Sequence, residues 1–198
     1  LAGMTAWESV ITRGRLRLAE TILLAAANGG VGSVALQLAK AAGAFVYATC
    51  SARSMAFVRG IPVVGGMGPD RVFDYKQGDW SAALKDDLAH AGRTLDIVFD
   101  AAGQDVVSRT IPLLRDGGRI VSIVNPSGQF AEAYRRNITL HYVALMERRP
   151  SLAPIKRLLE DGLLVPLIDS VMPLEKAADA HRKLEAGGVH GKIVLEVQ

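Results

Sequence analysis

The sequence predicts an α/β fold with a doubly wound parallel sheet and helices on both faces. Two observations support this prediction. Strand-like and helix-like segments alternate along most of the 198 residues, a pattern that gives a parallel sheet covered on both sides. A glycine-rich turn also stands between the first apolar strand and the first helix, and a second strand follows it. Together they indicate the βαβ unit of a Rossmann fold.

The elements follow one another in a regular order. Residues 21–27 form an apolar run, as expected of a central strand buried on both faces, and residues 31–42 carry apolar residues at helical spacing up to Gly43. Residues 60–69 are rich in glycine and proline and predict a loop around one short strand. Further strands are expected at 45–49, 71–74, 96–100, 119–124, 138–146 and 192–197, and further helices at 54–59, 82–91, 106–114, 155–161 and 174–185. We expect strand 192–197 to close the main sheet.

Length and composition fit one globular domain, because 198 residues with 49% hydrophobic and 22% charged content can bury one sizeable core. We interpret 1–198 as that domain, with 1–20 as a lead-in helix and 21–198 as the sheet and its C-terminal return. The first residues have neither a basic start nor an apolar core, so we interpret them as an excised or truncated beginning rather than a secretory signal.

Charge and cysteine content exclude several classes of function. The net charge is only +3 and its basic residues form no recognisable module, which argues against a nucleic-acid partner. No apolar run approaches the roughly 20 residues that cross a bilayer, so no membrane segment is expected. Cys50 is the only cysteine, which excludes a disulfide framework and a cysteine-based structural zinc site. A reducing cytoplasm is the expected compartment.

The glycine-rich turn has the chemistry to hold a pyrophosphate. A backbone approaches phosphate oxygens only where Cβ atoms are missing, and Gly29 and Gly30 provide that clearance between Asn28 and Val31. The free amides and the positive dipole end of the following helix favour an anion there. The first glycine of the usual G-x-G-x-x-G pattern is replaced by Ala27. A tight turn without a ligand therefore remains the alternative.

The end of the second strand favours NADPH over NADH. NAD-selective sites place an acid about 20 residues after the glycines, to accept from the ribose hydroxyls. This chain has no acid between Glu20 and Asp70, and it carries Ser51 and Arg53 in that region, a hydroxyl and a guanidinium suited to a ribose phosphate. The alternative for Arg53 is a solvated surface arginine, although a cation at a helix start is mildly unfavourable.

In these features the chain resembles the medium-chain dehydrogenase/reductase superfamily, specifically its zinc-independent quinone oxidoreductase branch. The resemblance covers nearly the whole chain as short matches in a fixed order. They are Gly3-Met4-Thr5-Ala6-Trp7, Asn28-Gly29-Gly30-Val31-Gly32, Gln37-Leu38-Ala39-Lys40, Phe73-Asp74-Tyr75, Val98-Phe99-Asp100-Ala101-Ala102-Gly103, Gly117-Gly118-Arg119-Ile120-Val121-Ser122 and Gly191-Lys192-Ile193-Val194-Leu195.

The resemblance implies roles for individual residues. By position, Thr5 would lie beside the nicotinamide, Ser51 and Arg53 would select the ribose phosphate, and Tyr75 would complete that pocket. A half-buried strand tyrosine is the equal alternative for Tyr75. Lys192 would reach the pyrophosphate or else remain solvated. Loops bordering the two riboses would be formed by Ala101 and Ala102 after one strand and by Ile123, Val124 and Asn125 after the next.

Two departures from the family matter. Leu1 stands where zinc alcohol dehydrogenases carry a ligating cysteine, and leucine cannot bind zinc, so no metal is expected. The N-terminal catalytic domain of the family is not encoded here, and it would supply most groups that protonate or orient a substrate. The catalytic residues are therefore unknown. Asp100 at a strand end could serve as an acid or base, but capping of the next turn is the more ordinary role.

The favoured hypothesis is an NADPH-dependent reductase whose small-molecule substrate is a quinone, an enone or a related conjugated carbonyl. A non-catalytic dinucleotide-binding module, serving as a sensor or scaffold, is one alternative, and a relative of the zinc-type alcohol dehydrogenases is another. We also expect a homodimer through strand 138–146, because a long apolar strand would otherwise leave an open sheet edge.

Overall fold

The computed structural model describes residues 1–125, 130–144 and 151–197. Its main sheet has six strands in the order β5-β2-β1-β6-β7-β8, and every neighbouring pair is parallel. The strands are β1 (Thr21–Ala25), β2 (Phe45–Cys50), β5 (Arg71–Asp74), β6 (Leu95–Asp100), β7 (Leu114–Ser122) and β8 (Thr139–Tyr142). Because the order reverses between β1 and β6, this is the doubly wound arrangement of dinucleotide-binding folds, and the predicted fold class is confirmed.

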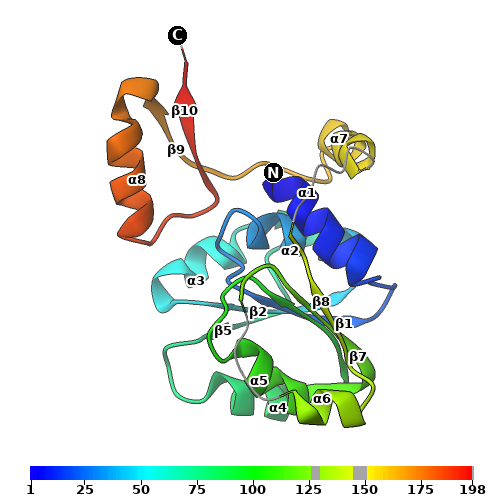
Figure 1. The fold of residues 1–198 in the computed structure, drawn as a ribbon. Helices are drawn as coiled ribbons and strands as arrows, with labels where there is room; N and C mark the ends of the chain where they lie inside the picture. Colours follow the sequence, from blue (N-terminus) through cyan, green and yellow to red (C-terminus); the bar gives the residue numbers. More distant parts are fainter. Residues whose placement is uncertain (126–129, 145–150, 198) are drawn as a thin grey trace.

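Helices cover both faces of the sheet (Figure 1). One face carries α1 (Ala2–Trp7), the π-helical turn η1 (Glu8–Arg13), α2 (Gly32–Ala41) and α3 (Ala52–Arg59). The other face carries α4 (Trp80–His90), α5 (Val106–Thr110), the 3₁₀ turn η2 (Ile111–Leu113) and α6 (Ala131–Arg135). Helix α7 (Leu152–Glu160) packs beside α1.

Strand β1 lies in the centre and divides the core in two. All five of its residues are buried, and successive side chains point to opposite faces. Ile22 and Leu24 belong to the cluster under α1, α2 and α3, whereas Leu23 and Ala25 belong to the cluster over α4 and α5. Burial on both faces explains why residues 21–25 are a continuous apolar run rather than an alternating one.

The C-terminal segment departs from the expected topology. β10 (Lys192–Glu196) pairs in parallel with β9 (Ile168–Pro173) in a separate two-stranded sheet. The 3₁₀ turn η4 (Leu174–Lys176) and α8 (Ala177–Glu185) connect these strands. We call β9, η4, α8 and β10 the C-terminal unit, and Figure 1 shows it to one side of the main sheet. The expectation that strand 192–197 closes that sheet is wrong, because an apolar pattern predicts a strand but not its neighbour.

Smaller differences concern element ends. The helix expected at 106–114 stops at Thr110, since Pro112 cannot continue it, and β7 begins earlier than expected, at Leu114. The glycine-rich segment forms a short antiparallel hairpin of β3 (Pro62–Val63) and β4 (Gly66–Met67). Of the strand expected at 138–146, Thr139–Tyr142 is observed, and residues 145 and 146 lie outside the described residues. Within the described ranges no helix has the length and apolarity to cross a membrane.

Candidate functional site

The glycine-rich turn joins the C-terminal end of β1 to the start of α2. Gly32 opens the helix, and a Cβ atom there would lie 2.2 Å from the carbonyl oxygen of Ala26. Only glycine fits at that position without moving the backbone. A Cβ atom on Gly29 would meet nothing closer than 3.5 Å, so the surface above Gly29 is open. In the first turn of α2 the Ser33 amide donates to the Gly29 carbonyl oxygen at 2.9 Å. Other first-turn amides have no acceptor within a helix, which makes a helix start a place where an anion can bind.

Lys192 lies directly over this turn. A Cβ atom on Gly30 would be 2.9 Å from the Lys192 Nζ atom and 2.3 Å from its Cε atom. The amide of the preceding Gly191 donates to the carbonyl oxygen of Asn28 at 2.9 Å, and Gly29 and Gly191 form an isolated parallel bridge. The C-terminal unit is therefore hydrogen-bonded to the glycine turn. It holds the Lys192 amine beside the glycine turn, where the resemblance implied a basic group.

Asp100 organises the loops that follow β6 and β7. Its side chain is fully buried, and its Oδ1 atom accepts from the amides of Ala102 at 3.0 Å and Gly103 at 2.7 Å. The Ser122 hydroxyl donates to its Oδ2 atom at 3.0 Å, and the Ile123 amide donates to its carbonyl oxygen at 3.1 Å. The capping role expected for Asp100 is confirmed. Asp100 thus holds both of the loops that the resemblance assigned to the cofactor, one through its carboxylate and the other through its carbonyl oxygen and Ser122.

A hollow of about 400 Å³ opens at the carboxyl ends of the strands. It brings together three of the expected residues, Asn28, Tyr75 and Ala102. Tyr75 is 46% exposed there, so its ring is accessible rather than packed into the core. The hollow is also lined by residues that sequence reasoning missed, namely Ala26, Thr49, Trp80, Gln104, Asp105, Val106 and Arg109.

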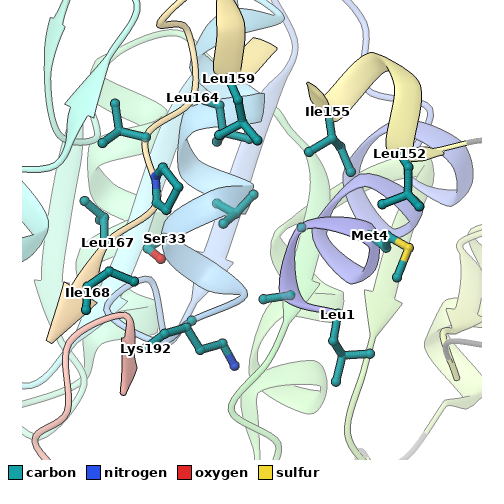
Figure 2. Close-up of a pocket in the computed structure, with 16 residues that line it drawn as sticks. Leu1, Met4, Ser33, Leu152, Ile155, Leu159, Leu164, Leu167, Ile168 and Lys192 are labelled. Carbon is teal, nitrogen blue, oxygen red and sulfur yellow. The ribbon is translucent and has the colours of Figure 1, made fainter. Parts of the chain in front are cut away.

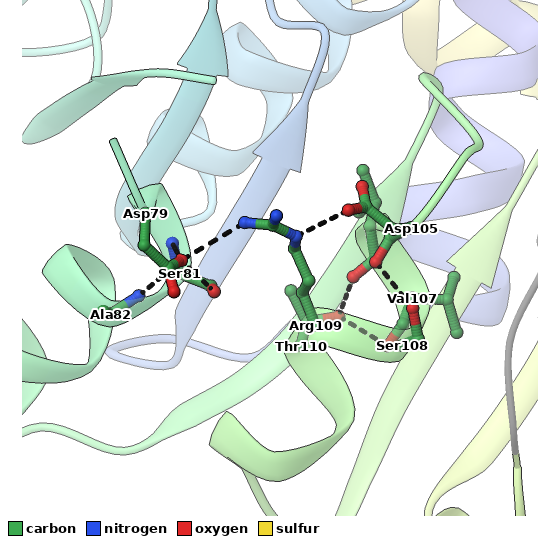
Figure 3. A network of polar contacts seen from close by, with 9 residues as sticks. Asp79, Ser81, Ala82, Asp105, Val107, Ser108, Arg109 and Thr110 are labelled. Atoms are coloured by element: carbon green, nitrogen blue, oxygen red, sulfur yellow. Dashed lines mark hydrogen bonds and ion pairs between the residues drawn. The ribbon is translucent and has the colours of Figure 1, made fainter. Parts of the chain in front are cut away.

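Arg109 is the cation that lines this hollow, and two carboxylates hold it (Figure 3). Its Nε atom donates to Asp105 at 2.6 Å, one helical turn before it, and its Nη1 atom donates to Asp79 at 3.2 Å. Asp79 also caps α4 by accepting from the Ser81 hydroxyl and from the Ser81 and Ala82 amides. The Ser81 hydroxyl is the largest cause that lowers the pKa of Asp79. Of these contacts, the sequence could indicate only the pair of Asp105 and Arg109, because residues four apart are neighbours on a helix.

Ser51, Arg53 and Thr5 do not line this hollow. Ser51 stands at the N-cap of α3, but its hydroxyl makes no capping hydrogen bond. Arg53 is exposed on the first turn of the same helix and has no hydrogen bond or ion pair within the part of the chain that the structure describes. Thr5 is 8% exposed in α1, and its hydroxyl donates to the Leu1 carbonyl oxygen at 3.1 Å.

A second cavity, of about 410 Å³, also reaches the glycine turn, where Gly30 lines it (Figure 2). It is mostly apolar and is walled by α1, by α7 and by residues 164–168. Met4 and Ile155 line it from the two helices, and Gly30 and Lys192 lie at its boundary. The glycine turn therefore borders both the polar hollow and this apolar cavity.

The described residues do not fit a metal ion. Across 1–125, 130–144 and 151–197, no three His, Cys, Asp or Glu side chains come together as a possible ligand set. Cys50 is buried in β2, and burial raises the pKa of its thiol to about 11. A neutral buried thiol is neither a metal ligand nor a nucleophile.

Comparison with known proteins matches this geometry. A protein-family model described as "Zinc-binding dehydrogenase" covers residues 67–195. The chain belongs to the medium-chain dehydrogenase/reductase superfamily. It is 35% identical over 207 residues to the chloroplast envelope quinone oxidoreductase homolog of Arabidopsis thaliana, which covers 99% of this chain and 60% of that protein. The resemblance predicted from the sequence is thereby confirmed.

Solved structures of this superfamily superpose over the whole chain. The quinone oxidoreductase of Coxiella burnetii gives a TM-score of 0.84 at 28% identity and covers 100% of this chain and 58% of its own. A structure described as an NAD-dependent alcohol dehydrogenase gives 0.86 at 32% identity, covering 100% of this chain and 57% of its own. The chain thus spans about three fifths of the length of these medium-chain dehydrogenase/reductase relatives.

Proposed function

We propose that this chain is the NADPH-binding part of an oxidoreductase that reduces a quinone, an enone or a related conjugated carbonyl. The observation that carries the proposal is the open glycine turn with the Lys192 amine beside it. A pyrophosphate over Gly29 would meet first-turn amides of α2 on one side and the Lys192 amine, which lies over Gly30, on the other. This fit favours a dinucleotide over an uncharged ligand.

The loops give the rest of the cofactor its neighbours. The hollow beside Tyr75 and Arg109 offers an aromatic ring and a guanidinium to the adenosine end. The loop at Ile123, Val124 and Asn125, held by Asp100, would border the nicotinamide ribose. When bound, the nicotinamide supplies a hydride to the conjugated carbonyl, and a proton completes the two-electron reduction. The groups of this chain bind and orient, because Asp100 uses both carboxylate oxygens in structural hydrogen bonds.

A preference for the phosphorylated dinucleotide follows from the end of β2. No acid follows this strand before Asp70, and the Asp70 carboxylate pairs with Lys40 and accepts from the Val46 amide. It therefore cannot take the ribose hydroxyls. Ser51 and Arg53 stand at the start of α3, where a ribose phosphate would find a hydroxyl and a cation that has no side-chain partner among the described residues.

The apolar cavity at Gly30 supports a largely apolar substrate. Its walls from α1, α7 and residues 164–168 place hydrocarbon next to the glycine turn. The names of the relatives support a quinone or a similar conjugated carbonyl as the substrate class. They include a quinone oxidoreductase homolog of Arabidopsis thaliana and the quinone oxidoreductases of Homo sapiens and Coxiella burnetii. For assembly and location, we propose a homodimer through β8, and the cytoplasm as the reducing compartment that a single buried cysteine suits.

Calorimetric titration of the protein with NADPH and with NADH tests the cofactor. We expect NADPH to bind at least roughly tenfold more tightly, the worth of one charge-assisted phosphate contact. Arg53→Ala should remove most of that difference by weakening NADPH alone. Arg59→Ala, at the other exposed end of α3, is the matched control and should leave both affinities unchanged. Tighter binding of NADH would overturn the assignment.

The substrate class needs a separate assay with the full-length protein. We expect loss of NADPH absorbance with a simple quinone or with a cyclic enone. No NADPH should form when the protein is given NADP⁺ and a primary alcohol. The opposite pattern would favour an alcohol dehydrogenase. Tight NADPH binding with no turnover of either substrate would favour the non-catalytic module.

A further inference from the structure

His190 connects the C-terminal unit to the helix that carries Ser51 and Arg53. Its ring stacks on Phe57 of α3 with the centroids 4.4 Å apart and the planes 12° from parallel. Its Nε2 atom lies 3.0 Å from the Ser54 hydroxyl oxygen on the same helix. Both contacts join His190 to residues of α3 that lie more than 130 positions earlier in the sequence. The imidazole therefore packs against one defined face of this helix.

The contact continues from Ser54 to Ser51. Ser54 is only 1% exposed, and its hydroxyl oxygen lies 3.3 Å from that of Ser51. Ser51 does not use its hydroxyl to cap α3. His190, Ser54 and Ser51 therefore form a row of three polar groups that ends after β2, where the proposed function puts the ribose phosphate of NADPH.

The direction of the hydrogen bonds in this row decides what Ser51 can offer. A hydroxyl has one proton to donate. If the His190 Nε2 atom carries a proton, Ser54 accepts from it and donates to Ser51, and Ser51 keeps its own proton for an outside acceptor. If Nε2 is bare, Ser54 donates to it and accepts from Ser51, so Ser51 can only accept. A phosphate offers acceptors and requires the first arrangement, whereas a ribose hydroxyl suits either.

We propose that His190 is a positioning residue for cofactor selectivity, acting through Ser54 to turn the Ser51 hydroxyl into a donor for the ribose phosphate of NADPH. The inference rests on the proposed function and deepens it. The backbone of His190 is itself held in place, because its amide donates to Asp169 at 3.1 Å and Lys183 pairs with the same carboxylate.

The test measures NADPH and NADH affinities of His190→Phe by calorimetry. Phenylalanine keeps a ring to stack on Phe57 and removes the nitrogen that contacts Ser54. We expect the NADPH dissociation constant to rise roughly fivefold to tenfold, the effect of one hydrogen bond, and the NADH constant to change less than about twofold. His190→Gln, whose amide can donate to Ser54, should recover part of the loss. His181→Phe, on α8 of the same unit, is the matched control and should change neither constant.

A double-mutant cycle separates positioning from general loosening. Ser54→Ala should lower NADPH affinity as His190→Phe does, and the double variant should resemble Ser54→Ala alone, because both changes cut the same row. Equal weakening of both dinucleotides, additive effects in the cycle, or no change in His190→Phe would each overturn the proposal. The wild-type titration tests the proposed function separately. If wild type prefers NADPH and His190→Phe keeps that preference, only the role of His190 fails.

Discussion

At the residue level, Lys192 links the C-terminal unit to the glycine turn of the main fold. It begins β10 in the C-terminal unit, yet its amine lies over Gly30 of the main fold. The Lys192 amide donates to the Leu167 carbonyl oxygen at 3.0 Å, whereas its Nζ amine makes no hydrogen bond or ion pair within the part of the chain that the structure describes, so the charge is available to a ligand. We propose that Lys192 binds the pyrophosphate, which NADPH and NADH share. Ser51 and Arg53 are instead proposed to bind the ribose phosphate, which only NADPH carries.

Replacing this amine tests whether Lys192 binds the pyrophosphate rather than the ribose phosphate. Lys192→Met keeps a long apolar side chain over Gly30 and removes the charge. We expect the dissociation constants of NADPH and NADH to rise by a similar factor of roughly ten, the worth of one charged hydrogen bond, with the selectivity unchanged. Calorimetry at low and moderate salt measures this, and Lys85→Met on α4 is the control. Loss of affinity for NADPH alone would place Lys192 at the ribose phosphate instead.

Individual residues differ in how far the sequence could predict them. The open backbone at Gly29 could be predicted because clearance at a turn depends on local residue type, whereas the Lys192 side chain over Gly30 could not. Asp100 could be assigned because a carboxylate caps amides two and three residues ahead. Arg109 and Trp80 could not, since they reach the hollow from α5 and α4 only once the sheet has aligned those helices. His190 was equally invisible, because its contacts lie in a helix far away in the sequence.

At the level of elements, the junction of β1 and α2 sets two different demands on glycine. Gly32 is required by packing, since its Cβ atom would lie 2.2 Å from one backbone oxygen and 2.9 Å from the Ala27 Cα atom. Gly29 has space around it, with no atom nearer than 3.5 Å. The fold therefore depends on Gly32, whereas we propose that dinucleotide binding depends on Gly29.

Two alanine substitutions at this junction should therefore behave oppositely. Gly32→Ala should lower the free energy of unfolding by about 1–3 kcal/mol, as overpacking does, because backbone rather than a flexible side chain stands in the way. Gly29→Ala should change stability by less than about 1 kcal/mol but weaken dinucleotide binding, because its methyl group enters the open anion site. Urea denaturation and calorimetry on both variants measure the two effects. A stable Gly32→Ala protein would contradict the packing argument.

The elements of the main sheet were predictable where local pattern and burial agree. A continuous apolar run predicted β1, because a parallel sheet buries both faces of its central strands. The same reasoning failed for β10, whose residues are intermediate or exposed and whose partner is β9. Strand pairing depends on long-range register. In this case the bridge between Gly29 and Gly191 directs the chain past the turn instead of into the sheet.

For the molecule as a whole, the parallel sheet leaves β5 and β8 at its two edges. β8 pairs with β7 on one side, and no described strand covers its other side. Tyr142 at its end is 60% exposed, and Thr139 at its start is also exposed. An uncovered edge offers unpaired amide and carbonyl groups to another strand. Pairing of β8 with its copy across a two-fold axis would satisfy them and extend the sheet through the dimer.

Light scattering at micromolar concentration tests this assembly. We expect wild type to be a dimer and Tyr142→Lys to shift it toward monomer, because the two-fold axis would bring two new like charges to one interface. Tyr134→Lys is the matched control, since Tyr134 is 86% exposed on α6 rather than on the edge strand, and it should leave the dimer intact. Dinucleotide affinity should be the same in all three proteins, because Asn28, Tyr75 and Ala102 line the hollow without any residue from β8. A monomeric wild type would show that this edge stays open in solution, and dissociation by Tyr134→Lys would move the interface to α6.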